Sequence, residues 1–389
     1  MQDILIISKS SVSALGHDKD SIWKKYQSKE TAITMCCFND RDTPTAKLHP
    51  ETEDELQHLR KENNHYRRLD KSVLLGIMAG RQALKQSGWN NFSNVGINMG
   101  SSRGATQLFE KYHRHFIESP NDRMTPLVSP TTTLGNIASW LAFDLGTQGA
   151  TLSHSITCST ALHSILNACI WIKSETTERF IAGGSEAPLS DFTIAQMRAL
   201  GIYTKNNKSE WPCSPLKDSY KSNTMVLGEG SAVFCLEKNK GQESLAKIVG
   251  LGYATEHIKH PASLSADADC IRKSMQMALE DSRLSEVDAI VMHAPGTTQG
   301  DKAELKAIKT VFGENSPHLI STKHHSGHTF GASGGLSLDL AIDMLNKQSL
   351  IAFPYSTDVE QKNIAPKSIM VNAIGFGGNA VSIIVQKTD

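Results

Sequence analysis

The sequence has no excess of charge of either sign and no long hydrophobic run. Its 389 residues include 40 Lys and Arg and 40 Asp and Glu, so the formal net charge is zero. A balanced charge gives no electrostatic reason to expect nucleic acid or an anionic membrane surface as a partner. No apolar run reaches the roughly 18 residues that a membrane span needs. We therefore expect no transmembrane helix.

The sequence also lacks a recognisable cysteine framework. Its seven cysteines include no CxxC pair and show no regular spacing, which fits a reducing compartment better than a disulfide scaffold. Residues 1–7 have no basic region before their short apolar run, so they do not read as a signal peptide. We expect a cytoplasmic protein, long enough for two domains or for one duplicated unit.

What the sequence does have is strands that alternate with helices along its whole length. This alternation predicts a layered α/β architecture. The expected strands are at 4–7, 95–99, 180–182, 246–251, 289–293, 319–321 and 368–373. The expected helices are at 21–27, 71–86, 106–116, 130–143, 191–200, 267–281, 301–312 and 330–345. The polar stretch 36–55 is expected to be irregular, and Asp191 is expected to cap its helix.

A weak internal repeat suggests that the chain is duplicated. Gly-Ser-Ala-Val-Phe begins at Gly230 and Gly-Asn-Ala-Val-Ser begins at Gly378, each near the end of one half of the chain. The polar, glycine-containing segment 238–243 lies between the halves and is a plausible boundary. We predict an N-terminal half at 1–240 and a C-terminal half at 241–389.

One cysteine is placed where a nucleophile would be expected. The stretch 155–172 begins with small polar residues and continues as a helix too apolar to leave a polar face, which predicts a buried helix. Cys158 is expected in its first turn, where unpaired N–H groups and the helix dipole favour a thiolate. It is a candidate nucleophile, although buried cysteines also serve as small apolar filler.

Two histidines fall in glycine-containing loops between a strand and a helix. One strand is expected to end at His293, and Asp301 is expected to cap the helix that follows. Another strand is expected to end near Ser321, with His328 in the loop before a helix that begins near Gly331. Loops of this kind carry functional groups in α/β folds, so both histidines are candidate site residues.

Three other interpretations stay open at this point. His324, His325 and His328 could mark a metal site, although a glycine interrupts the helix that would align them and no HExxH glutamate is present. The glycine-rich segments 96–104 and 375–378 could bind a dinucleotide, although neither has the GxGxxG spacing. A cysteine and a histidine could also form a hydrolase site.

Four motifs taken together resemble those of the β-ketoacyl-acyl-carrier-protein synthases, in the elongating branch of the thiolase-fold condensing enzymes. The family motifs are a TACS-like cysteine turn, an HGTxTxxGDxxE loop, an SxKxxxGHxxGAxG loop and a GFGG turn. In this sequence they read Thr157-Cys158-Ser159, His293…Thr297…Gly300-Asp301…Glu304, Ser321…Lys323…Gly327-His328…Gly331-Ala332…Gly334 and Gly375-Phe376-Gly377-Gly378. Their order and nearly all of their internal spacing agree, and the resemblance covers essentially the whole chain.

The resemblance implies an α/β, thiolase-like fold with a duplicated, layered α-β-α-β-α architecture. It also implies a 3-oxoacyl-[acyl-carrier-protein] synthase, an acyltransferase. In the implied reaction malonyl thioester loses CO2 and condenses with an acyl group held on Cys158, in fatty acid or polyene/polyketide elongation. No metal and no cofactor are expected, because the substrates are carried on the phosphopantetheine of an acyl carrier protein.

The resemblance assigns the reacting groups residue by residue. Cys158 would carry the acyl group as a thioester. His293 and His328 would donate hydrogen bonds to the enolate that forms when CO2 leaves. The backbone N–H groups of Cys158 and Phe376 would hold the oxyanion of the condensation step.

Further residues are assigned to support and substrate binding. Lys323 would pair with Glu304, orienting the site and setting its charge without transferring a proton. The alternative for Glu304 is an ordinary solvated helix residue. Thr297, Phe376 and Gly377 are expected to bind substrate.

The resemblance also implies protein partners. An acidic carrier protein would need a local basic rim on a chain of zero net charge, and the expected docking residues are Arg67, Arg68, Arg123 and Lys205. Enzymes of this fold pair through a strand beside the active site. We therefore expect a homodimer, or a heterodimer with a related ketosynthase-like subunit.

The sequence departs from the family pattern in the first histidine loop. Ala294 and Pro295 replace the family's glycine and first threonine, which would reshape the grip on pantetheine and suggests a specialised member. The alternative function is a non-catalytic chain-length partner of a ketosynthase heterodimer. Such partners lack the nucleophilic cysteine, whereas Cys158 is present here.

Overall fold

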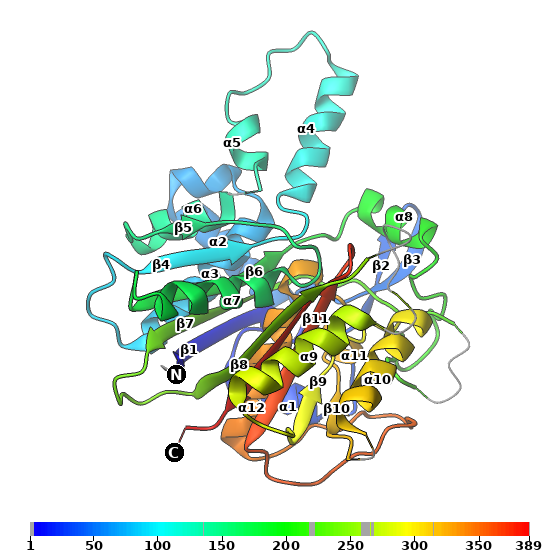
Figure 1. The fold of residues 1–389 in the computed structure, drawn as a ribbon. Helices are drawn as coiled ribbons and strands as arrows, with labels where there is room; N and C mark the ends of the chain where they lie inside the picture. The colour runs from blue at the N-terminus through cyan, green and yellow to red at the C-terminus, as the bar shows by residue number, and fades with distance from the viewer. Residues whose placement is uncertain are drawn as a thin grey trace.

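The computed structural model describes residues 4–134, 136–217, 222–257, 265, 268–313 and 315–388. In this part of the chain one large mixed sheet runs through the molecule, with helices on both sides of each half (Figure 1). Across the described residues no helix is both long and apolar enough to cross a membrane. The expectation of a layered α/β architecture is confirmed.

The elements have the following bounds. The sheet contains β1 (Ile4–Ser13), β4 (Gly96–Gly100), β5 (Thr151–Leu152), β6 (Arg179–Glu186), β7 (Gly230–Lys238), β8 (Ala246–Thr255), β9 (Ala289–Val291), β10 (His318–Ile320), β11 (Ser368–Gly375) and β12 (Asn379–Gln386). A separate hairpin is formed by β2 (Thr34–Phe38) and β3 (Arg41–Thr45). The helices are α1 (Lys19–Gln27), α2 (Pro50–Glu62), α3 (Lys71–Ser87), α4 (Thr106–Glu118), α5 (Val128–Thr132), α6 (Asn136–Leu145), α7 (Thr160–Lys173), α8 (Asp191–Ala199), α9 (Asp269–Ser282), α10 (Thr298–Phe312), α11 (Lys323–Ser326) and α12 (Ser333–Lys347). Two 3-10 helices, η1 (Asn64–Arg68) and η2 (Phe330–Ala332), complete the set.

The strand order shows the duplication directly. One half of the sheet runs β5-β4-β6-β7-β1 and the other runs β10-β9-β11-β12-β8. In both halves the first three strands are parallel and the last two join antiparallel. The halves meet where β1 pairs with β8. The two segments of the sequence repeat form β7 and β12, and these strands therefore hold equivalent places in the two halves.

The helices sort into layers on either side of the two half-sheets. α7 and α12 contact each other at the centre, with α7 against β6 and α12 against β11, while α3 and α6 cover the first half-sheet and α9 covers the second (Figure 1). All but three of the residues of α12 are buried, as is most of α7. Because neither helix has a polar face, each is stable only inside the molecule.

Three local predictions were wrong. The stretch 36–55 is not irregular, because it contains the β2–β3 hairpin and the start of α2. The single helix expected at 130–143 is two helices, α5 and α6. Asp191 is the first residue of α8, and the cap is Ser190, whose side chain accepts a hydrogen bond from the N–H of Thr193.

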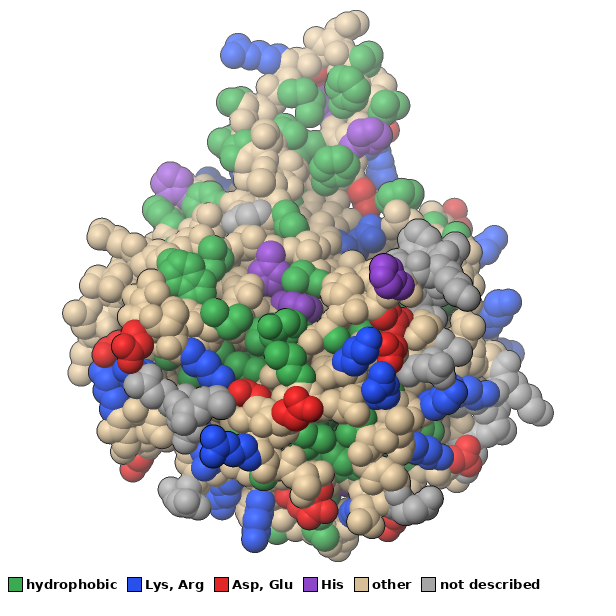
Figure 2. Space-filling model, viewed as in Figure 1, with side chains coloured by type: hydrophobic (Ala, Val, Ile, Leu, Met, Phe, Trp, Pro, Cys, Tyr) green, Lys and Arg blue, Asp and Glu red, His purple; other side chains and the backbone are tan. Residues whose placement is uncertain are grey.

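An arm made of α4 and α5 projects from the body of the molecule (Figure 1). Hydrophobic side chains gather on its surface (Figure 2). Phe109, Phe116 and Ile117 of α4 are each at least half exposed, which is uncommon for large apolar residues on one element. The arm starts just after β4, whose neighbour β5 is an open edge of the sheet.

Candidate active site

Cys158 lies in a tight turn just before α7, not in the helix itself. α7 begins at Thr160 with Ser159 as its cap, two residues after Cys158, so the prediction that Cys158 lies in the first turn of the helix was wrong. Thr157 has a φ of +45°, a costly conformation for a β-branched residue. The Thr160 hydroxyl stabilises the turn, since it donates to the Thr157 carbonyl (2.6 Å) and accepts from the N–H of Ile156 (2.9 Å).

Burial decides the protonation of the cysteine. The Cys158 side chain is only 5% exposed, and burial raises the pKa of its thiol to about 12, with a smaller contribution from the Glu186 carboxylate. The Lys323 ammonium acts in the opposite direction on this pKa. The expectation that the helix start favours a thiolate is therefore wrong for the resting protein, which holds a thiol there.

His328 is the residue in contact with the sulfur. Its Nε2 lies 3.1 Å from Cys158 Sγ. Its Nδ1 lies 3.3 Å from Ser333 Oγ, and its backbone N–H donates to the Val226 carbonyl (2.7 Å). Burial lowers the pKa of His328 to about 3, so the imidazole is neutral at neutral pH.

His293 completes the cluster from the other loop of the second half. Its ring centroid is 5.2 Å from that of His328, with the two rings nearly perpendicular. Burial, followed by the neighbouring His328, holds the pKa of His293 well below its usual value. Two neutral imidazoles thus face the space beside Cys158, as the sequence predicted, and each can donate one N–H to a developing negative charge.

Glu304 fixes the backbone of the His293 loop. Its carboxylate accepts hydrogen bonds from the N–H groups of His293 (3.0 Å) and Ala294 (2.8 Å), and from the Asn372 side chain (3.3 Å). Glu304 is 2% exposed, so it is not a solvated helix residue, and burial raises the pKa of its carboxyl.

Asp301 acts in the same loop, because its carboxylate accepts from the N–H groups of Gly296 and Thr297. It does so from inside α10, whose cap is Thr297, so the prediction that Asp301 is the cap residue was wrong.

Lys323 is buried without the direct partner that the resemblance implied. Its Nζ donates to Ser337 Oγ (3.1 Å) and approaches the Met292 carbonyl (3.5 Å). Among the described residues no ion pair within 4.0 Å joins it to Glu304, whose oxygens are occupied by N–H donors. Burial lowers the pKa of Lys323 to about 8, although the Glu304 charge acts to raise it. The expected Lys323–Glu304 pair is therefore an electrostatic influence at a distance and not a contact.

The lowered pKa of Lys323 predicts a pH dependence of stability. The pKa of Lys323 is about 8 in the folded protein, whereas the ordinary lysine value of 10.5 applies to the unfolded chain, so the unfolded chain binds the proton more tightly. Below pH 8 the buried Lys323 charge lowers the free energy of unfolding by its full amount. Between pH 8 and 10.5 the folded protein loses this charge, so the free energy of unfolding rises by up to about 1.4 kcal/mol per pH unit. Urea unfolding of the protein and of Lys323→Met from pH 7 to pH 10 measures it. The difference in unfolding free energy should grow in favour of the wild type, and a pH-independent difference would contradict it.

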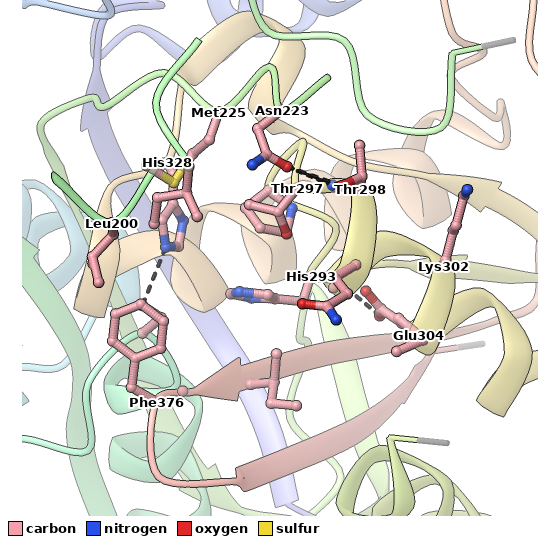
Figure 3. Close-up of a pocket in the computed structure, with 18 of the residues that line it drawn as sticks. Leu200, Asn223, Met225, His293, Thr297, Thr298, Lys302, Glu304, His328 and Phe376 are labelled. Atoms are coloured by element: carbon pink, nitrogen blue, oxygen red, sulfur yellow. Dashed lines mark hydrogen bonds between the residues drawn. The ribbon is translucent and has the colours of Figure 1, made fainter. Parts of the chain in front are cut away.

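The reacting groups open into a cavity of about 610 Å³. Cys158, His293 and His328 line it, together with Thr297 and Phe376. Figure 3 shows the two histidine rings and the Phe376 ring turned toward the same space. The predicted substrate-binding residues Thr297 and Phe376 thus border the site.

The turn after β11 brings Phe376 to the cysteine. The Thr157 hydroxyl donates to the Phe376 carbonyl (3.3 Å). A Cβ at Gly375 would lie 2.0 Å from Thr157 Oγ1 and 3.3 Å from the N–H nitrogen of Cys158, so only glycine permits this approach. Gly377, with a φ of +93°, shapes the turn but does not line the cavity.

Sequence reasoning missed the polar residues at the cavity mouth. Asn223 accepts hydrogen bonds from the backbone N–H and the hydroxyl of Thr298 (2.9 and 3.1 Å), which ties its segment to the start of α10 (Figure 3). Lys302 also lines the cavity and is exposed. Asn223 carries no motif, and a lysine on an amphipathic helix reads as an ordinary solvated residue.

A buried glutamate near the cysteine was also missed. Glu186 ends β6, and its carboxylate accepts from the N–H groups of Ser102 and Gly331 (3.2 Å for Gly331). Burial raises the pKa of this carboxyl to about 7. We expected the strand to end before Gly183 and Gly184, whereas β6 continues through both glycines to Glu186. A longer predicted strand would have placed Glu186 at its end.

The expected docking residues do not line the cavity. Arg67 and Arg68 belong to η1, and Arg68 Nη1 lies 3.5 Å from Thr125 Oγ1 in the arm. Arg123 is exposed in the same arm, whereas Lys205 is exposed in the loop after α8. The four cations thus occupy the surface around the arm and the α8 loop, and their role stays a prediction.

The metal-site and dinucleotide-site interpretations find no geometric support in the described part of the chain. No group of three or more His, Cys, Asp or Glu there is arranged to hold a metal ion. His324 and His325 pack against each other and Trp211, whereas His328 contacts Cys158. A Cβ at Gly100 would lie 2.2 Å from Thr160 Cγ2, so this glycine of the 96–104 segment serves close packing.

Comparison with known proteins agrees with this geometry. The family model for the Beta-ketoacyl synthase, N-terminal domain matches residues 1–241, and the model for the Beta-ketoacyl synthase, C-terminal domain matches residues 245–354. The chain is 25% identical over 410 residues to 3-oxoacyl-[acyl-carrier-protein] synthase 2 of Staphylococcus aureus (strain COL), covering 99% of this chain and 98% of that protein.

Solved structures show the same fold at low sequence identity. A chain of the ishigamide ketosynthase/chain length factor matches with a TM-score of 0.88 at 16% identity, covering 100% of both chains. A chain of AntDE:AntF, a type II PKS acyl-carrier protein in complex with its ketosynthase bound to the hexaketide, matches with a TM-score of 0.87 at 18% identity, again over 100% of both. The predicted thiolase-like fold is confirmed. Because the two family models together span most of the chain, this protein belongs to the β-ketoacyl synthase family of acyltransferases.

Proposed function

We propose that the chain is a 3-oxoacyl-[acyl-carrier-protein] synthase that condenses malonyl carrier protein with an acyl group held on Cys158. The observation that carries this proposal is the Cys158–His328 contact of 3.1 Å, with the His293 ring beside it in one cavity. A nucleophile, a base in contact with it and a second neutral donor are the groups that the two half-reactions require.

The first half-reaction transfers the acyl group to the sulfur. Because the Cys158 thiol is protonated at rest, its proton must leave as the new C–S bond forms. His328 Nε2 is placed to accept it, and Nδ1–H would then donate to Ser333 Oγ. The C–S bond of the carrier thioester breaks, and the proton passes from His328 to the departing pantetheine sulfur.

The second half-reaction forms the carbon–carbon bond. The C–C bond to the malonyl carboxylate breaks, CO2 leaves, and the electron pair becomes an enolate. His293 would donate an N–H group to its oxygen, and so would His328 in the tautomer that carries its proton on Nε2 and accepts from the Ser333 hydroxyl at Nδ1. The enolate carbon attacks the acyl carbonyl on Cys158, whose oxyanion the N–H groups of Cys158 and Phe376 would hold. The Cys158 sulfur leaves as a thiolate and takes a proton from solvent.

The product of this reaction is the test of the proposal. The protein is incubated with malonyl-carrier and a series of acyl-carriers, and product masses are read. We expect acyl chains extended by one two-carbon 3-oxo unit, absent with Cys158→Ala and unchanged with Cys37→Ala, which removes an exposed thiol. A wild-type protein that gives no extended product with any acyl group would refute the proposal.

A carrier protein would dock on the cations near the arm. The support is a group of exposed cations, Arg67, Arg68 and Arg123, of which Arg68 lies beside the arm. Arg68→Glu should raise KM for carrier-bound substrate about tenfold through charge repulsion and spare a small thioester mimic. Lys387→Glu, an exposed charge reversal elsewhere, is the matched control. An equal loss with both substrate forms would argue against docking at Arg68.

A second subunit would cover the arm and the edge of the sheet. The support is the exposed apolar surface of α4 and the open edge strand β5, which presents unpaired backbone groups. The partner is a second copy or a related ketosynthase-like subunit. Light scattering of the purified chain, alone and with such a subunit, distinguishes the two.

The alternative is a non-catalytic chain-length partner. Its support is the likeness to a chain of the ishigamide ketosynthase/chain length factor. A chloroacetyl carrier probe followed by peptide mass mapping separates the readings, because a catalytic subunit is labelled at Cys158 and a chain-length partner is not.

A further inference from the structure

An arginine lies beside the cavity in a position that the proposed reaction and the docking surface do not use. Arg103 follows β4 in the segment that leads into the arm. Its Cζ is 5.8 Å from the ring centroid of Phe330, which lines the cavity with Cys158. The Phe330 ring is 5.4 Å from the His328 ring. One aromatic ring therefore separates the guanidinium from the reacting groups.

One hydrogen-bond donor of Arg103 is buried and unused. Nη2 donates to Gln196 Oε1 (2.6 Å), whereas Nε is buried and has no hydrogen-bond partner among the described residues. A guanidinium has five N–H donors in a rigid plane. An unpaired buried donor costs free energy, so this arrangement favours an acceptor that arrives with a ligand.

The surrounding structure holds this segment in place. Glu186 accepts from the N–H groups of Ser102 and Gly331, which ties the segment before Arg103 to the η2 segment that carries Phe330. At the start of the arm, Gln107 donates to the Leu189 carbonyl (3.0 Å). Arg103 is thus fixed between β4, α8 and η2, and it is not a mobile surface cation.

The wall between the sulfur and this pair is apolar. Leu189, Ile194, Met197 and Phe330 pack with Cys158 in one hydrophobic cluster. Met197 lines the cavity and is the neighbour of Gln196 in α8. An acyl group placed along this wall would meet apolar side chains first and would then reach toward the Arg103–Gln196 pair, which lies behind the residues that line the cavity.

We propose that Arg103 and Gln196 recognise an oxygen acceptor on the acyl group carried by Cys158. The preferred substrate class is an acyl chain with an oxygen remote from the thioester, and not a plain alkyl chain. This inference rests on the proposed function. A site built to bond a polar group rejects the analogue that lacks it, because its own donors are left unpaired.

The test compares ω-hydroxyacyl and alkyl acyl groups of equal length on the carrier, with acylation of Cys158 followed by intact mass. The wild type should prefer the hydroxylated group at least about tenfold in kcat/KM. Arg103→Met keeps the stem and removes the donors, so it should bring the ratio near one by improving the alkyl substrate. Arg114→Met, an exposed change in the arm, should leave the ratio unchanged.

The ratio separates recognition from structural damage, because a damaged site loses both substrates together. Gln196→Leu supplies a second variant, for which a partial fall of the ratio is expected. A wild-type preference for the alkyl group, or a ratio that Arg103→Met does not change, would overturn the inference and leave the proposed function intact. Failure of every acyl group to reach Cys158 would overturn both.

Discussion

His293→Ala should lower condensation by about 10²–10³-fold while leaving acyl transfer to Cys158 close to the wild-type rate. The loss is that of one hydrogen-bond donor to an oxyanion. The selectivity follows from geometry, because His328 is the histidine in contact with the sulfur, whereas His293 contacts the His328 ring. Single-turnover acylation with a radiolabelled acyl-carrier, followed by addition of malonyl-carrier, measures the two steps separately.

His328→Ala is the matched comparison. It removes both the base for acylation and a donor to the enolate, so both steps should slow. The division of labour would be contradicted if His293→Ala slowed acylation as much as condensation. It would equally be contradicted if His328→Ala left acylation unchanged.

Glu304→Leu should destabilise the protein by about 3 kcal/mol and disable condensation. The substitution leaves the buried N–H groups of His293 and Ala294 without their acceptor, at a cost of about 1–3 kcal/mol for each. The same loss frees the backbone that positions the His293 ring. Urea unfolding at neutral pH gives the free energy, and product mass gives the activity.

Lys309→Leu is the control for this prediction, since it alters the exposed face of the same helix. Its effect on stability should stay within about 0.5 kcal/mol. Glu304→Gln keeps the shape of the side chain but turns one acceptor into a donor that faces an N–H group. Its loss of stability should therefore lie between those of Lys309→Leu and Glu304→Leu. A Glu304→Leu protein as stable as Lys309→Leu would contradict the role assigned to the carboxylate.

The sequence was sufficient to predict the two histidines of the site, because each follows a strand. His293 and His328 were found because glycine loops after strands are visible in the chain, and the equivalence of β7 and β12 was found from a short repeat. Cys158 lies beside His328, as predicted, although neither its place in the helix nor its protonation was predicted correctly. Helix propensity says nothing of the depth of burial that raises its pKa.

Contacts between distant segments escaped the sequence for a physical reason. The neighbours of Lys323 are Ser337 and the Met292 carbonyl, and no local pattern marks a serine one helix away as a partner for a lysine. Glu186 was missed because paired glycines suggested a turn. In the fold, the Cβ of an alanine at Gly183 would lie 1.9 Å from the Ala232 carbonyl oxygen, so these glycines let two strands and a loop approach closely.

Mass mapping of the protein after incubation with an acyl-carrier tests the central claim most directly. The account predicts that one acyl group is added, on the peptide that contains Cys158, and that malonyl-carrier removes it with release of a longer 3-oxoacyl product. An acyl group found on Cys37 or on another cysteine, or an acylated Cys158 that malonyl-carrier never discharges, would contradict it.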